Sequence, residues 1–320
     1  MIGRSSSWFI SYDLRPGKQI ERRIVLDTLQ AAKAAGFEIE SLPMIGMGGV
    51  RFIDFLLANR MLGMKRFTSL EHDENLIPRC EFNKPFHNFR IFDGSSSQYI
   101  EQEGFSEASI VWFDYERGIS KDLRDDVVAL AGALKPGSFV FMTATAEMPE
   151  YLKKIAGLSK RLSQLQADID PFGAQLQPND LNTKVFHVSA AKILRAMLSF
   201  GFSGRGDGMF FPYLRLNYKD TIWMMTVGGY FGSGSEVARI RKAFVNRCDF
   251  LRPSAREFVY VVEQFNITDA ERRLFDRASI ARRSRRTEKM TLRKLGFRES
   301  IVSQYSDLMR FIPRYFESVL

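Results

Sequence analysis

Met44-Ile-Gly-Met-Gly-Gly-Val50 follows an apolar run and precedes an amphipathic stretch, and this segment decides the fold prediction. Glycine has no Cβ, so it lets the backbone approach a bound ligand closely at a turn from a strand into a helix. We therefore expect a ligand-facing turn at Gly46, Gly48 and Gly49. One such turn does not identify a fold by itself, because many α/β proteins contain glycine turns.

Three short apolar runs after this turn each end in an acidic residue. They are Phe67–Glu71, Phe89–Asp93 and Ile110–Asp114. In open α/β sheets, ligands bind outside the carboxyl ends of the parallel strands. We therefore expect the three terminal acids of these runs to lie in one binding zone.

Strand-like and helix-like patterns alternate through the first half of the chain, which predicts a parallel sheet. Strands are expected at about 39–45, 66–71, 88–92, 109–113 and within 134–142, and helices at 18–35, 52–62 and 123–134. Residues 209–216 and 221–230 flank the turn-forming segment Asn217-Tyr-Lys-Asp220, which predicts an antiparallel hairpin.

This order of parts resembles the Rossmann-like fold of class I S-adenosylmethionine (SAM)-dependent methyltransferases, over about residues 20–150. Leu134–Met142 is similar to that family's turn into its fifth strand, and the hairpin corresponds to the pair that completes the family's sheet. The resemblance implies an α/β fold, a SAM cofactor and methyl transfer, in the manner of an O-methyltransferase.

By position, the resemblance also implies which residues contact the cofactor. The glycine turn lies under the methionine part, the acid that ends the second strand holds the ribose hydroxyls, and polar residues after the third strand lie beside the adenine. His72 is included because a one-residue shift of the strand end would replace Glu71. The implied set is Gly46, Gly48, Gly49, Glu71, His72, Asp93, Gly94 and Ser95.

The end of the family's fourth strand lies beside the transferable methyl group, which implies that Asp114, Tyr115 and Glu116 are the catalytic candidates. A methyltransferase mainly aligns its acceptor and removes a proton when the acceptor is a hydroxyl. The two acids are candidates for a general base or hydrogen-bond acceptor, and the tyrosine for positioning a flat acceptor. The paired prolines and the Pro-Cys nucleophile of the DNA-modifying members are missing here, so an oxygen acceptor is the default.

Two positions depart from the family pattern. Met44 stands where an acid is common, and Val50 where a further glycine is common. These departures leave open an alternative, a catalytically inactive protein of this fold that binds nucleic acid or a protein partner. A nicotinamide-dinucleotide site is disfavoured, because its fingerprint requires a glycine where Arg51 stands.

The chain of 320 residues carries a net charge of +9, and much of the excess lies between residues 277 and 298. Clustered cations attract nucleic acid or another anionic partner. Two further cations flank Pro16-Gly17, where they are placed to approach an acidic substrate or the cofactor carboxylate. The predicted substrate or partner contacts are Arg15, Lys18, Arg282, Arg283, Arg285 and Arg286.

Composition limits the remaining classes. No apolar stretch approaches the roughly 20 residues that span a bilayer, and a secretory signal is missing, so a cytoplasmic location is expected. Cys80 and Cys248 are too isolated to predict a disulfide or zinc site, and no metal is predicted. Residues 1–232 are expected to form the α/β domain, with a helical insertion at about 151–205, and 233–320 a mainly helical basic region.

Overall fold

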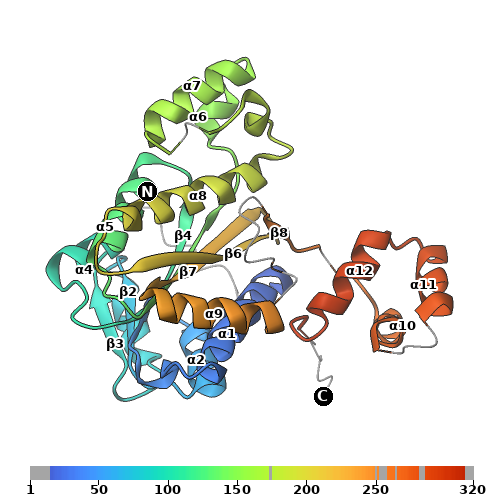
Figure 1. Cartoon of the computed structure of the whole chain (residues 1–320), viewed down its shortest axis with the longest axis horizontal. Coiled ribbons are helices and arrows are strands. Elements are labelled where there is room, and N and C mark those ends of the chain that lie inside the picture. The colour runs from blue at the N-terminus through green and yellow to red at the C-terminus, as the bar shows by residue number, and fades with distance from the viewer. Residues whose placement is uncertain are drawn as a thin grey trace.

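A computed structural model of the chain describes residues 15–172, 175–248, 251, 258–263, 265–280 and 285–313. These residues contain one eight-stranded sheet of order β3-β2-β1-β4-β5-β7-β6-β8 (Figure 1). The strands are β1 (Met44–Gly46), β2 (Phe67–Glu71), β3 (Arg90–Asp93), β4 (Ile110–Gly118), β5 (Ser138–Thr145), β6 (Met209–Lys219), β7 (Trp223–Gly232) and β8 (Tyr260–Val261).

Strands β1 to β5 run parallel, and β7 runs antiparallel to both β5 and β6. The predicted parallel sheet and terminal hairpin are confirmed. The hairpin turn is shorter than predicted, because Asn217 and Lys219 still pair with β7. At the sheet edge, β8 adds a parallel strand that the sequence did not predict, since two residues are too few to show a period.

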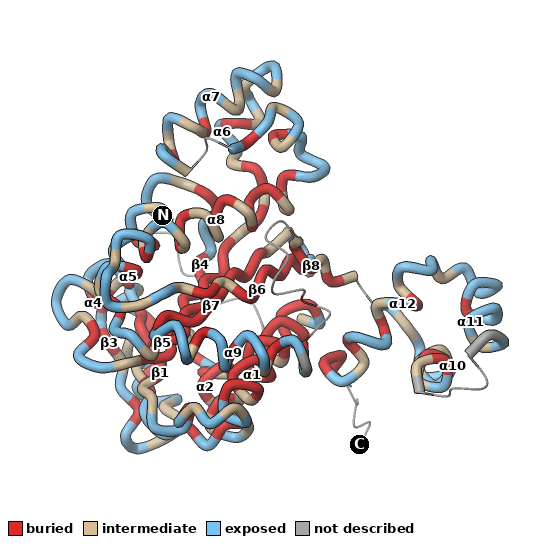
Figure 2. The backbone as a smooth tube through the Cα atoms, in the orientation of Figure 1, coloured by how far each residue is buried: buried red, intermediate tan, exposed pale blue. Residues whose placement is uncertain are grey.

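Helices cover both faces of the sheet (Figure 1). One face carries α1 (Pro16–Ala34), α2 (Ile53–Leu62), α3 (Ile77–Phe82) and α9 (Gly234–Arg247), and the other carries α4 (Ser96–Gln102), α5 (Lys121–Ala133) and α8 (Phe186–Ser203). The helical insertion consists of α6 (Glu150–Lys153), α7 (Leu158–Ile169), a 3₁₀ turn and α8. Each face therefore has its own apolar core, and the strands between them are deeply buried (Figure 2).

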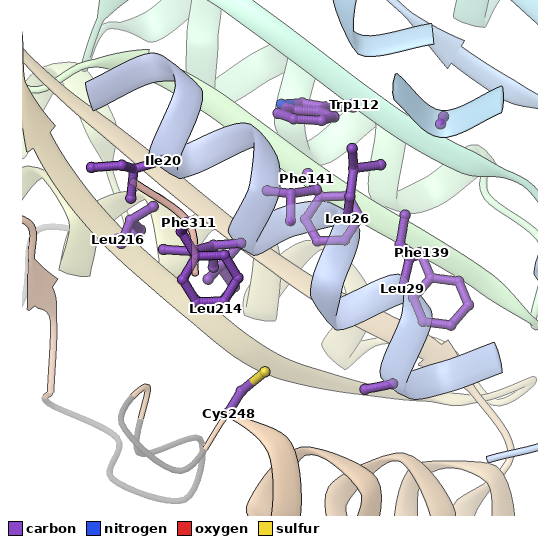
Figure 3. Packing of buried hydrophobic residues seen from close by; sticks show 14 of the residues in the cluster. Ile20, Leu26, Leu29, Trp112, Phe139, Phe141, Leu214, Leu216, Cys248 and Phe311 are labelled. Carbon is purple, nitrogen blue, oxygen red and sulfur yellow. The ribbon is translucent and has the colours of Figure 1, made fainter. Parts of the chain in front are cut away.

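Helix α1 crosses the centre of the sheet. Pro16 starts the helix at its first turn, where no N–H is needed, and Gly36 follows its end with φ +85°. Leu26 and Leu29 are fully buried and lie beside the aromatic side chains of β5 (Figure 3). Burial of each leucine stabilises the fold by about 1.5–3 kcal/mol, which anchors this helix against the strand ends.

The first predicted strand, 39–45, is wrong at its start. Ile39–Ser41 is a 3₁₀ turn, and the ladder begins at Met44, whose N–H donates to the Arg66 carbonyl at 2.9 Å. Pro43 has no N–H to donate, so it cannot serve as the donor that an earlier start would need. The strand is therefore short, and the glycine turn follows it at once.

The predicted helical C-terminal region is confirmed, with α10 (Asp269–Ile280), α11 (Arg285–Lys294) and α12 (Glu299–Leu308) following β8. These helices pack on one another and are largely exposed elsewhere (Figure 2). Arg310 after α12 donates to Asp27 of α1 at 2.8 Å, which ties the region to the main core. The domain division at residue 232 stays a prediction.

Candidate functional site

The glycine turn between β1 and α2 is built for close approach. A Cβ on Gly48 would lie 2.7 Å from the rings of Phe52 and Phe55, so a side chain does not fit there without movement. Gly49 has φ +51°, a left-handed conformation that glycine adopts at no steric cost. The backbone N–H of Gly48 donates to the Ser69 hydroxyl of β2 at 3.0 Å.

Ser69 thus supplies a polar contact to a turn whose preceding strand offers none. Met44 and Val50, the two departures from the family pattern, are both buried in the core of the α1 face. The orienting hydrogen bond comes from the neighbouring strand instead. Ser69 was not among the predicted site residues, because a serine inside an apolar strand has no local signature.

Glu71 ends β2 and lies opposite Asp93 of β3 in the parallel ladder. Its carboxylate is buried and accepts the Asp73 N–H at 3.0 Å. Burial raises the pKa of Glu71 above its ordinary value. Among the described residues, no Lys or Arg forms an ion pair with it, while the His72 side chain is 75% exposed.

The segment after β3 lies against the end of β2. The Gly94 N–H donates to the Glu71 carbonyl at 2.8 Å, which brings these two predicted cofactor positions together. Gly94 has φ +155°, and Asp93 before it is exposed. Ser95 caps α4, because its hydroxyl accepts the Gln98 N–H at 3.2 Å.

Asp114 lies inside β4, because that strand continues to Gly118 instead of ending at residue 113 as predicted. Successive side chains of a strand point to opposite faces. Asp114 points to the α1 face, whereas Tyr115 is buried in the core of the other face and donates to the Ser96 hydroxyl at 3.0 Å. Glu116 is exposed. The structure therefore separates Tyr115 from Asp114.

The first turn of α1 carries the closest partner of Asp114. The Lys18 ammonium lies 2.6 Å from an Asp114 oxygen and 3.0 Å from a Glu21 oxygen. Lys18 and Glu21 are almost completely buried, whereas the Asp114 side chain is 25% exposed. Two residues that the sequence analysis predicted separately, Lys18 and Asp114, are thus brought into contact.

The turn between β6 and β7 fixes the start of α1. Asp220 accepts the N–H groups of Gly17 and Lys18 at 2.8 and 3.1 Å. A carboxylate at a helix N-terminus satisfies otherwise unpaired N–H groups and interacts well with the helix dipole. Arg15, the N-cap residue of α1, lies beside this contact.

The charge state of Lys18 follows from its neighbours. Burial lowers the pKa of Lys18, but Asp114 and Glu21 outweigh that effect, and the pKa lies well above its ordinary value. Burial raises the pKa of Glu21, and the positive charge of Lys18 opposes the rise. Lys18 therefore stays an ammonium and acts as the cation of these ion pairs, not as a base.

Glu21 was missed, although the sequence carries a signal for it. It lies one helical turn before Ile24 and Val25, which are apolar and fully buried. A charged residue on the buried side of an amphipathic helix needs a partner, because an unpaired buried charge is very costly. The three-residue spacing from Lys18 indicates the partner.

The predicted anionic-partner contacts cannot be placed. Arg282 and Arg283 lie outside the described residues, and the side chains of Arg285 and Arg286 in α11 are not described. Among the residues described, no helix combines the length and apolar character that a membrane crossing requires. The same ranges hold no group of three or more His, Cys, Asp or Glu placed to bind a metal ion.

A protein family described as "Putative O-methyltransferase" matches residues 10–320. The chain belongs to this family. The membership confirms the predictions of an enzyme and of SAM-dependent methyl transfer to oxygen, and it does not favour the inactive binding protein.

Solved structures similar to the methyltransferase include a putative O-methyltransferase from Klebsiella pneumoniae, 8% identical, covering 73% of this chain and 93% of that one at a TM-score of 0.41. N-methyltransferase NodS from Bradyrhizobium japonicum WM9 is 11% identical, with coverages of 67% and 97% and a TM-score of 0.39. The Methanococcus jannaschii fibrillarin pre-rRNA processing protein is 12% identical, with coverages of 64% and 74% and a TM-score of 0.36. No curated protein matches the chain.

Proposed function

We propose that this O-methyltransferase binds SAM at the glycine turn and the ends of β2 and β3, and methylates a hydroxyl that meets Asp114. The contact between Lys18 and Asp114 is the observation that supports this most strongly. Trp112, two residues before Asp114 on β4, pairs with Gly46 at the start of the glycine turn. The proposed acceptor position and the proposed cofactor position are therefore adjacent on neighbouring strands.

The residues present fit the cofactor. Gly48 and Gly49 give the turn a backbone without side chains. At Gly48 the neighbouring rings leave no room for a Cβ, so a larger residue does not fit there. The buried Glu71 carboxylate suits a pair of hydroxyl donors, because charge-assisted hydrogen bonds are the strong ones. Asp93 and Gly94 also lie beside the carboxyl end of β2, at the position proposed for the adenine.

Bound SAM would supply an electrophilic methyl group on a sulfonium, a strong leaving group. The chain's own task is then to orient the acceptor oxygen and take its proton. The exposed part of Asp114 is available to accept that hydroxyl proton, while Lys18 fixes the other side of the carboxylate. Glu116, exposed two residues further along β4, is a second proposed contact for the acceptor.

Calorimetric titration with SAM and S-adenosylhomocysteine tests the cofactor site. We expect saturable binding by the intact protein and its loss in Gly48→Arg, since that side chain would collide with Phe52 and Phe55. Glu40→Gln, in an exposed pair with Lys33 remote from the proposed site residues, serves as the control. Absence of binding by a folded wild-type protein would reject the proposal.

Labelled methyl transfer from SAM to a panel of catechol, simple phenols, aliphatic alcohols, RNA and protein then tests the acceptor class. Product that survives mild base treatment identifies an ether and excludes an ester. Asp114→Asn must abolish most of this transfer while SAM binding remains. Transfer to nitrogen or carbon acceptors alone would contradict the assignment to oxygen.

The basic C-terminal region is proposed to contact an anionic partner. Helix α11 carries Lys289, Arg293 and Lys294, and the chain as a whole is cationic. Phosphate contacts release counterions, so binding of RNA should weaken steeply as salt rises. Replacing Lys289 and Lys294 by alanine should reduce that salt slope by about two, or the proposal fails.

A further inference from the structure

We infer that Glu21 is a positioning residue, which holds the Lys18 ammonium against Asp114 and so fixes the orientation of Asp114 toward the acceptor hydroxyl. This inference rests on the proposed function. The Glu21 side chain is fully buried, and its carboxylate lies 3.0 Å from the Lys18 ammonium, which in turn lies 2.6 Å from an Asp114 oxygen. Glu21 and Asp114 also act on each other as like charges, but the contact that links their orientations is Lys18.

Two strands hold the Glu21 carboxylate directly, and a third strand supports one of the contacts. One oxygen accepts the Thr143 hydroxyl of β5 at 2.9 Å and the Thr226 hydroxyl of β7 at 2.7 Å. The Trp112 indole N–H of β4 donates to the Thr143 oxygen at 3.1 Å, so the whole chain of donors ends at Glu21. The other carboxylate oxygen is left for Lys18 at 3.0 Å.

This arrangement gives the carboxylate a single orientation. An ionised carboxylate accepts hydrogen bonds but cannot donate them. The hydroxyls of Thr143 and Thr226 both donate to the same Glu21 oxygen. Thr143 and Thr226 are themselves fully buried in neighbouring strands of the sheet. The sheet therefore sets where Glu21 lies, Glu21 sets where Lys18 lies, and Lys18 sets where Asp114 lies.

The shared ammonium also explains why two acids surround one lysine. Lys18 alone with Asp114 would form a simple ion pair, with no constraint on the rest of the long lysine side chain. With Glu21 as a second anchor, the Lys18 side chain is fixed between two carboxylates.

Glu21→Gln tests the inference, because glutamine keeps the volume and one acceptor oxygen. We expect kcat to fall roughly ten- to a hundredfold, since small misplacements of catalytic groups cost that much, with KM for SAM unchanged. Lys18→Met with Glu21→Gln removes both charges at similar volume, which often preserves stability. Because Glu21 acts through Lys18, kcat should fall no further in the double variant than in Lys18→Met alone.

A spectroscopic readout separates positioning from mere stability. In protein carrying isotope-labelled lysine, the Lys18 ammonium titrates in solution NMR, and Glu21→Gln should lower its pKa by removing a neighbouring negative charge. The ionisable groups around this pair are Asp114 on β4, Arg22 on α1 with its partner Asp54 on α2, and Tyr218 and Asp220 at the end of β6. Glu40→Gln, in the exposed Lys33 pair, should change neither the Lys18 signal nor kcat.

The outcomes are distinct from those of the proposed function. If wild-type protein methylates nothing, the proposed function fails, and the Lys18 titration still tests the contact with Glu21. If Glu21→Gln keeps wild-type kcat in folded protein, or leaves the Lys18 pKa unchanged, the positioning role is overturned. The positioning role is also overturned if kcat falls further in the double variant than in Lys18→Met, because Glu21 would then act independently of Lys18.

Discussion

Two buried carboxylate clusters flank the end of β4, one on each face of the sheet. On the α5 face, Asp126 accepts hydrogen bonds from Ser96 at 3.1 Å, Ser97 at 2.6 Å and Arg117. On the α1 face, Asp114 has the Lys18 ammonium beside one oxygen and remains 25% exposed. The first carboxylate has a full set of donors from the protein, whereas the second keeps room for another molecule.

This difference separates a structural acid from a candidate catalytic one. Buried polar groups are normally satisfied within the protein, and such groups hold elements together. Asp126 joins α4, α5 and the end of β4 in this way, and the nearby Tyr115 has its pKa raised by burial, which keeps its phenol neutral. Asp114 has a protein partner at one oxygen and is partly exposed, so its carboxylate can still bind a ligand.

The largest expected effect is the loss of methyl transfer in Asp114→Asn, which tests whether the two acids have different roles. Asp114→Asn removes the proposed proton acceptor, so methyl transfer should fall by about a hundredfold or more. The same change at Asp126 should leave transfer per folded protein within about tenfold of wild type, because Asp126 faces the other side. Initial rates with labelled SAM measure both, and equal losses would remove the distinction between the clusters.

Glu71 extends the comparison to the cofactor side. Glu71→Gln should weaken SAM binding by roughly ten- to a hundredfold, the range for hydrogen bonds to a charged group. Since burial raises the Glu71 pKa, wild-type affinity should fall as the pH drops through that raised value, where the carboxylate takes up a proton. Titration calorimetry across pH tests this, and a variant with the wild-type pH dependence would contradict it.

The same raised pKa has a consequence for stability. Glu71 binds its proton more tightly in the folded than in the unfolded chain, so folding loses stability as the pH rises through the interval between the two values. Glu71→Gln should therefore unfold at higher urea concentration than wild type at neutral pH. Glu107→Gln, in an exposed pair with Arg66, gives the reference.

The loss in the free energy of unfolding should be larger for Asp126→Asn than for Asp114→Asn, the opposite of their order in methyl transfer. Asp126→Asn disrupts charge-assisted hydrogen bonds and should cost about 1.5–3 kcal/mol. Asp114→Asn leaves Lys18 paired with Glu21, so no buried charge is left unpaired, and it should cost less than Asp126→Asn. Urea unfolding followed by circular dichroism measures both, and a larger loss at Asp114 would make it a structural residue.

The smallest expected effect concerns the glycine turn. Ser69→Ala removes the acceptor of the Gly48 N–H and should weaken SAM binding by about two- to tenfold, the value of one neutral hydrogen bond. Ser41→Ala, which removes an exposed hydroxyl bonded to the Glu38 carbonyl, is the matched control. Unchanged affinity in Ser69→Ala would show that the glycines alone order the turn.

Much of the fold was predictable from local patterns. The order of helices and strands, the parallel sheet and the hairpin follow from hydrophobic period and turn residues, and each was confirmed. The exceptions have local causes, as at Pro43, where a missing N–H shortens β1, and in β8, which is too short to show a period. Strand ends were less predictable, because β4 continues through polar Asp114 to Gly118, and both of these residues still pair with β5.

Local signals of a few residues each were enough to indicate a glycine turn and acids at strand ends in an order typical of a methyltransferase. Which of these residues meet depends on how the helices and strands pack. Lys18 reaches Asp114 because α1 crosses the sheet, and Tyr115 turns away because β4 continues past residue 113. Contacts between distant segments depend on how whole elements pack, and no local pattern encodes that packing.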